Sequence, residues 1–136
     1  ELCDREPEML RRLAKEISDR MGAFVISIGI EEGAVVRYVA LERGRVVDEY
    51  LSVPEHYGEI PPGEVIALGA NPRLMARLTG ADPEAVRSVA RTASTPAELP
   101  PPGELLASLA RLFAIGRGAF GYGRAASAAG AIELPR

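Results

Sequence analysis

Residues 23–53 read AFVISIGIEEGAVVRYVALERGRVVDEYLSV. Three runs rich in Val, Ile and Tyr follow one another here, over 23–31, 34–42 and 45–53. The pairs Glu32-Gly33 and Arg43-Gly44 separate them, and glycine at the second position of a two-residue turn permits the positive φ that tight hairpins need. The stretch therefore predicts a three-stranded antiparallel meander.

Two-residue turns would fix the register of this meander, pairing Ile30 with Val35 and Leu41 with Val46. One sheet face would then be apolar with four polar residues among the Ile and Val side chains: Arg37, Asp48, Tyr50 and Ser52. The opposite face would carry Tyr38, Val47, Glu49 and Leu51. Both faces are too apolar for exposure, so we expect helices on one and a further covering on the other. A one-residue bulge would exchange the two sets.

Helical patterns flank the meander. Apolar residues recur at three- and four-residue steps over 7–20, where Pro7 suits a first turn. Asn71 and Asp82 are N-cap candidates directly before prolines, and they predict short helices over 72–78 and from 83 onward. A Pro-rich linker over 95–102 leads to a helix over about 103–115.

These elements together predict an α+β domain over residues 1–115. A three- or four-stranded antiparallel sheet would be packed by the N- and C-terminal helices, with the short helix pair at one end. Residues 64–69 could supply the fourth strand or a loop segment buried under a helix. Residues 116–136 are mostly Gly, Ala and Arg, and they predict a loosely held C-terminal tail.

The composition excludes several chemistries. The chain has one His, one Cys, one Lys and one Asn, and it has no Gln or Trp. A zinc site of nitrogen and sulfur ligands alone and a CxxC redox centre are therefore excluded. We expect no catalytic residue, metal or cofactor on this basis.

Charge and cysteine content indicate the setting. Residues 21–70 hold eight acids and three bases, whereas residues 111–136 hold four bases and one acid. An acidic folded part argues against nucleic acid as the main partner. A lone cysteine, a start without signal-peptide character and the lack of a membrane-length apolar run predict a cytoplasmic protein. The many arginines and few amides favour a bacterial, thermophile-like source.

The first candidate ligand-binding site is the trio Arg37, Asp48 and Tyr50. In the predicted register Arg37 lies across from Tyr50 and diagonal to Asp48. A charged pair among Ile and Val must be paired and hydrogen-bonded to be tolerated. The trio is therefore either an anion or polar-ligand pocket, with Arg37 as the clamp, or a structural ion pair that fixes the register.

The second candidate is the loop 52–58, which holds His56 and Tyr57. His56 could act as a general base or bind a metal with Glu55 or Glu59. It could also contact a ligand or partner, or be a plain structural histidine. Ser52 and Asp48 lie close in sequence, but neighbouring strand residues rarely hold the geometry of a nucleophilic attack.

Two further patterns concern nucleic acids. The helices around Thr79-Gly80-Ala81 are similar to a helix-turn-helix, with Arg87 and Arg91 one turn apart, although packing of both helices on the sheet explains them better. The segment 116–124 mixes Arg, Gly and aromatics as RNA-binding tails do. Its GxGxxG string follows no strand, so a dinucleotide site is not predicted.

One resemblance adds to this picture. Residues 38–58 match the pattern YxALxxGxxVDEYxSxPEHYG, which resembles a pattern found in small uncharacterised bacterial proteins. The resemblance implies no activity.

The leading functional prediction is a non-enzymatic cytosolic binding module. Its contact surface would be the loop 53–63 and the sheet face around Tyr38, Glu49 and Tyr57, and Val47 and Leu51 would allow a homo-oligomer through that face. The alternative is a small hydrolase or transferase that uses Asp48, His56 and Glu55, with or without a metal. A third option is weak RNA binding through the tail. No membrane partner is expected.

Overall fold

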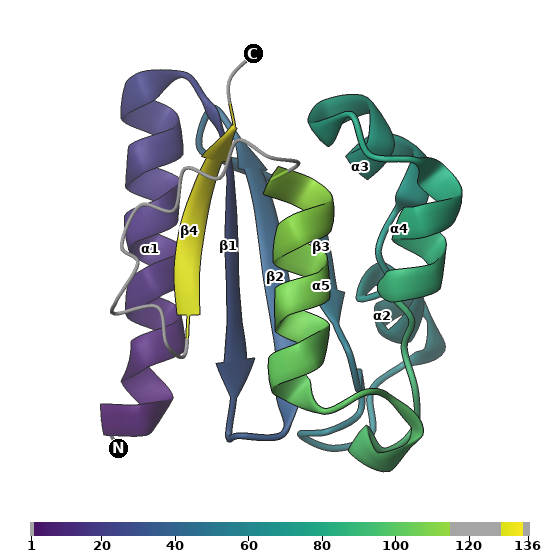
Figure 1. Ribbon diagram of the computed structural model, residues 1–136. Coiled ribbons are helices and arrows are strands. Elements are labelled where there is room, and N and C mark those ends of the chain that lie inside the picture. The colour runs from purple at the N-terminus through teal and green to yellow at the C-terminus, as the bar shows by residue number, and fades with distance from the viewer. Residues whose placement is uncertain (1, 115–128, 135–136) are drawn as a thin grey trace.

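The computed structural model describes residues 2–114 and 129–134, and it has an α+β fold (Figure 1). Four antiparallel strands form one sheet in the order β3-β2-β1-β4. The strands are β1 (Phe24–Glu31), β2 (Val35–Glu42), β3 (Arg45–Leu51) and β4 (Ala129–Leu134). The helices are α1 (Leu2–Met21), α2 (Pro62–Ala67), α3 (Pro72–Thr79), α4 (Pro83–Val89), η1 (Pro96–Glu98) and α5 (Pro102–Ala114). The predicted fold class is confirmed.

Helices cover both faces of the sheet, as its apolar composition predicts. α1 lies on one face, called here the α1 face, where Ala14 packs with Val25, Val39 and Leu41. α3, α4 and α5 cover the opposite face, called the α5 face (Figure 1). The larger core lies there, and it includes the fully buried Tyr38, Tyr50, Met75, Val86, Leu109 and Phe113.

The register of the meander differs from the prediction. In the first hairpin Glu31 pairs with Val35, so the loop has three residues and includes Ala34. In the second hairpin Leu41 pairs with Val46 as predicted, but a β-bulge follows and Ala40 pairs with Asp48. Because one extra residue changes which face every later side chain points to, these two irregularities regroup the sheet residues. Arg37 and Glu49 lie on the α1 face, whereas Tyr38, Asp48 and Tyr50 lie on the α5 face.

The N-terminal ends of α3 and α4 lie where the sequence predicts them. The Asn71 side chain accepts from the Leu74 N–H at 3.1 Å, and the Asp82 side chain accepts from the Ala85 N–H at 3.1 Å. Each N-cap precedes a proline in the first turn, where the missing N–H costs nothing. α1 starts earlier than predicted, so Pro7 lies inside this helix.

Two segments differ from the predicted elements. Residues 62–67 form α2 and not a fourth strand, and Ile66 there is 77% exposed. The fourth strand is β4, which pairs with β1 and so brings residues 129–134 of the predicted tail into the sheet. The rest of that tail, residues 116–128 and 135–136, lies outside the described residues.

Candidate functional site

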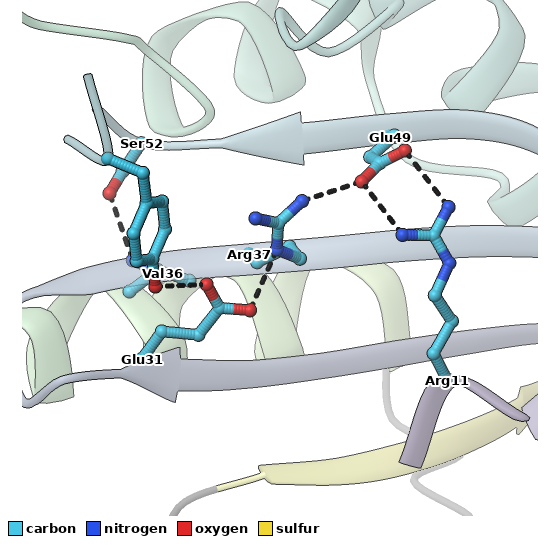
Figure 2. Close-up of polar contacts among 7 residues, drawn as sticks. Arg11, Glu31, Val36, Arg37, Glu49 and Ser52 are labelled. Atoms are coloured by element: carbon cyan, nitrogen blue, oxygen red, sulfur yellow. Dashed lines mark hydrogen bonds and ion pairs between the residues drawn. The ribbon is translucent and has the colours of Figure 1, made fainter. Parts of the chain in front are cut away.

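Arg37 lies at the centre of an ion-pair cluster on the α1 face (Figure 2). Its Nε is 2.7 Å from Glu31 Oε2, and its Nη1 is 2.6 Å from Glu49 Oε2. Arg11 of α1 approaches the same Glu49 with Nη2 at 3.3 Å from Oε1. Burial by itself would lower the pKa of Arg37, but the two carboxylates outweigh it and raise this pKa. The cluster thus spans β1, β2, β3 and α1.

The structure separates the predicted trio of Arg37, Asp48 and Tyr50. Asp48 Oδ2 accepts from the Tyr38 hydroxyl at 2.6 Å and from the Asn71 N–H at 3.0 Å, which joins the start of α3 to the sheet. The Tyr50 hydroxyl donates to the Arg91 carbonyl at 2.6 Å, and its ring stacks on Tyr38 with centroids 5.3 Å apart. The prediction that these three form one cluster is therefore wrong, because the β-bulge between β2 and β3 places Asp48 and Tyr50 on the opposite face from Arg37.

His56 and Tyr57 attach the loop after β3 to the first hairpin. His56 Nε2 is 2.8 Å from Glu32 Oε1, and the Tyr57 hydroxyl donates to Glu31 Oε1 at 2.7 Å. The two rings meet edge to face at 4.9 Å. Burial and the neighbouring carboxylate of Glu31 raise the pKa of Tyr57, so its hydroxyl stays a proton donor. Tyr57 nevertheless remains 55% exposed.

Backbone bonds hold this loop in one shape. Val53 is buried in a small cluster with Val35 and Leu51. The His56 N–H donates to the Val53 carbonyl, and the Gly58 N–H donates to the Glu55 carbonyl, both at 3.0 Å. The Glu55 side chain also accepts from the Ile60 N–H at 3.4 Å. Tyr57 is consequently presented by a loop that is anchored on both sides.

Ser52 completes the sheet where β3 ends. Its Oγ accepts from the buried Val36 N–H at 2.9 Å, and its own N–H donates to the Val36 carbonyl at 2.9 Å (Figure 2). Its carbonyl turns away and accepts from the Ala93 N–H. The side chain therefore replaces a backbone acceptor in the ladder.

Replacing Ser52 with alanine is expected to lower the free energy of unfolding by about 1.5 kcal/mol, because the Val36 N–H would lose its acceptor inside the fold. Chemical denaturation of both proteins measures this difference. Ser88 is an exposed helical serine, and its change to alanine should leave stability within about 0.5 kcal/mol. Equal effects of the two changes would contradict the role assigned to Ser52.

The structure does not gather the alternative catalytic set of Asp48, His56 and Glu55. Asp48 contacts Tyr38 and Asn71 on the α5 face, His56 contacts Glu32, and Glu55 accepts a loop N–H. Among the described residues, no three His, Cys, Asp or Glu side chains are placed to hold a metal ion. Sequence reasoning missed Glu31 and Glu49 as partners of Arg37, although all three share the α1 face once the register is corrected.

The remaining sequence patterns are also located. α3 and α4 pack on the α5 face through Met75 and Val86, and Arg87 forms an ion pair with Glu84 of its own helix. The Arg/Gly segment of the tail lies outside the described residues. Within the part of the chain that the structure describes, no helix has the length and apolar character to cross a membrane. Comparison with models of protein families, with curated proteins and with solved structures finds no match to this chain.

Proposed function

We propose that this chain is a non-enzymatic binding module of the cytosol whose contact surface is the loop 53–63 together with the adjoining end of the first hairpin. One observation carries the proposal: Tyr57 is 55% exposed although its hydroxyl and its ring are both held in place. An exposed aromatic ring normally loses entropy on binding, and here part of that cost has already been met in the free protein.

A fixed tyrosine is well suited to a contact surface. Tyrosine is among the residues that contribute most at protein interfaces, because it offers a large ring and a polar end. The exposed carboxylate of Glu32 acts on Tyr57, and the same loop carries two further exposed acids, Glu55 and Glu59. They favour a partner segment that carries positive charge next to an apolar or aromatic residue.

This surface is smaller than the one predicted from sequence. Tyr38 and Leu51 are buried, so their side chains are left out of the proposed surface. Glu49 forms ion pairs with Arg37 and Arg11, so we assign it a structural role in the sheet and not a place in the contact surface. The ligand-binding residues that remain from the sequence prediction are His56 and Tyr57.

The proposal can be tested with a library of random displayed peptides. Peptides are selected on the protein and counter-selected on its Tyr57→Ala variant, and binding is then measured by fluorescence anisotropy. We expect Tyr57→Ala to weaken binding at least about tenfold, which corresponds to about 1.4 kcal/mol. The free energy of unfolding should change by less than about 1 kcal/mol, because the ring is mostly exposed.

Two matched variants sharpen this test. Tyr57→Phe keeps the ring but removes the bond to Glu31, so it should weaken binding by less than Tyr57→Ala does. Ile66→Ala removes another exposed apolar side chain, 77% exposed on α2, and should leave binding unchanged. Selection of no Tyr57-dependent peptide, or equal losses for Ile66→Ala and Tyr57→Ala, would overturn the proposal.

A further inference from the structure

α1 carries an apolar row that the rest of the described protein covers only in part, at Ile17. Met9, Leu13 and Met21 are 63%, 39% and 60% exposed, and Ile17 between them is only partly buried. These four residues follow one another at steps of four, so they form one ridge along the helix surface. The side of α1 that packs on the sheet, through Ala14 and Ser18, lies next to this ridge, about 100° round the helix.

Two charged residues run beside this ridge. Arg12 and Glu16 are both exposed and lie one helical turn apart. Among the ion pairs of the described residues, neither of them has a partner, although their spacing would allow them to pair with each other. An apolar ridge beside unpaired charges of both signs is the composition of a helix that packs against another helix.

We propose that α1 is a self-association surface, on which α1 of a second copy packs in antiparallel orientation, with the two-fold axis crossing the ridge at the level of residue 14. A two-fold axis brings the same flank of both helices together. With the axis at this position, Arg12 faces Glu16 of the second copy, and Glu16 faces Arg12 of the second copy. The charges that stay unpaired in one chain are thereby paired twice in the dimer.

The same alignment fits the apolar ridges together. Leu13 falls opposite residue 15 of the second copy, which is the gap between its Leu13 and its Ile17. Met9 falls opposite residue 19, the gap between Ile17 and Met21. Side chains of each ridge therefore enter the grooves of the other, which is how packed helices interdigitate. An axis beside Glu16 would instead place Glu16 opposite Glu16 of the second copy, and Arg12 opposite its Arg20.

The dimer should be weak. A single pair of helices buries less surface than the roughly 1,200 Å² of the smallest stable specific interfaces. We therefore expect a dissociation constant on the order of tens of micromolar. The row of α1 shares no residue with the Tyr57 surface, so this inference does not depend on the proposed function.

Sedimentation velocity of the full chain, from a few micromolar to several hundred micromolar, tests the inference. The expected result is a monomer that becomes a dimer as concentration rises, and Leu13→Glu should abolish the dimer. Ile66→Glu, an equal change at an exposed apolar residue of α2, should leave the dimer intact. Thermal unfolding of each variant shows that loss of the dimer is not loss of the fold.

Charge reversal tests the register. Arg12→Glu alone places two glutamates opposite each other, and Glu16→Arg alone does the same with two arginines, so each variant should dimerise at least about tenfold more weakly. An equimolar mixture of the two variants pairs unlike charges at both contacts, and it should dimerise as the unchanged protein does. A protein that stays monomeric throughout, or a mixture that fails to recover the dimer, would overturn the inference.

Discussion

Replacing Arg37 with methionine is expected to lower the free energy of unfolding by about 2–3 kcal/mol. The substitution removes the cation that Glu31 and Glu49 share, and the side chains of these two residues are only 10% and 20% exposed. Removing one partner of a buried ion pair typically costs about 3–5 kcal/mol, because an uncompensated charge stays inside the fold. We expect a smaller loss than this for Arg37→Met, because the Arg37 side chain is itself 24% exposed and water reaches the cluster.

Urea denaturation at neutral pH measures this loss, and Arg11→Met provides the matched control. Arg11 bonds the same Glu49 but its side chain is 45% exposed, so its removal should cost less than about 1 kcal/mol. Adding Glu31→Gln and Glu49→Gln to Arg37→Met should restore part of the stability, because no uncompensated charge then remains. Equal losses for the two arginine variants would show that Arg37 is only a surface contact.

The predictable parts of this fold are those set by neighbours in sequence. Asn71 and Asp82 signal the starts of α3 and α4 because a side-chain acceptor followed by proline satisfies a helix start with no help from elsewhere. The three strands of the meander were predictable for the same reason, because Gly33 and Gly44 mark both turns within the chain itself. In the structure both glycines have positive φ, 64° and 79°.

The register of the strands was harder to predict from sequence, because one extra residue in a turn or a bulge changes it. Ala34 reads equally well as the start of a strand or as the third loop residue, and nothing local identifies the bulge before Asp48. The segment 64–69 is a short apolar run, which periodicity assigns equally to a strand or a helix. β4 was missed for the opposite reason, since a Gly- and Ala-rich strand has little β propensity and depends on pairing with β1.

The errors in the predicted register carried over to the predicted candidate site. Arg37 was recognised from sequence as a cation that needs a partner within the fold, and that requirement is physical and holds in any register. Which carboxylate meets it depends on the face, so Asp48 was chosen where Glu31 and Glu49 serve. His56 and Tyr57 were singled out from sequence as residues of the loop 52–58, but their contacts with Glu31 and Glu32 join segments that are distant in sequence.

Replacing Asp48 with alanine is expected to lower the free energy of unfolding by about 3 kcal/mol. The carboxylate accepts from the buried Tyr38 hydroxyl and from the backbone N–H groups of Asn71 and Glu49, and alanine accepts from none. A buried donor without an acceptor costs about 1–3 kcal/mol. Asp48→Asn keeps one acceptor oxygen and should cost about 1 kcal/mol, which urea denaturation resolves from the alanine variant.

The difference in stability between the unchanged protein and Asp48→Asn should depend on pH. Its direction shows whether burial or hydrogen bonding dominates the pKa of Asp48. Burial raises the pKa of Asp48, while the bonds from Tyr38, Asn71 and Glu49 act in the opposite direction without cancelling it. The folded protein therefore holds this proton more tightly than the unfolded chain, whose aspartates titrate near about 3.9. Asp48 contributes the resulting stability fully below that pH and loses it as the pH rises through the raised folded value. The stability of the unchanged protein relative to Asp48→Asn should accordingly fall from acidic to neutral pH. A rise over the same range would mean that the three hydrogen bonds outweigh burial, and that Asp48 stabilises the fold as a charged acceptor.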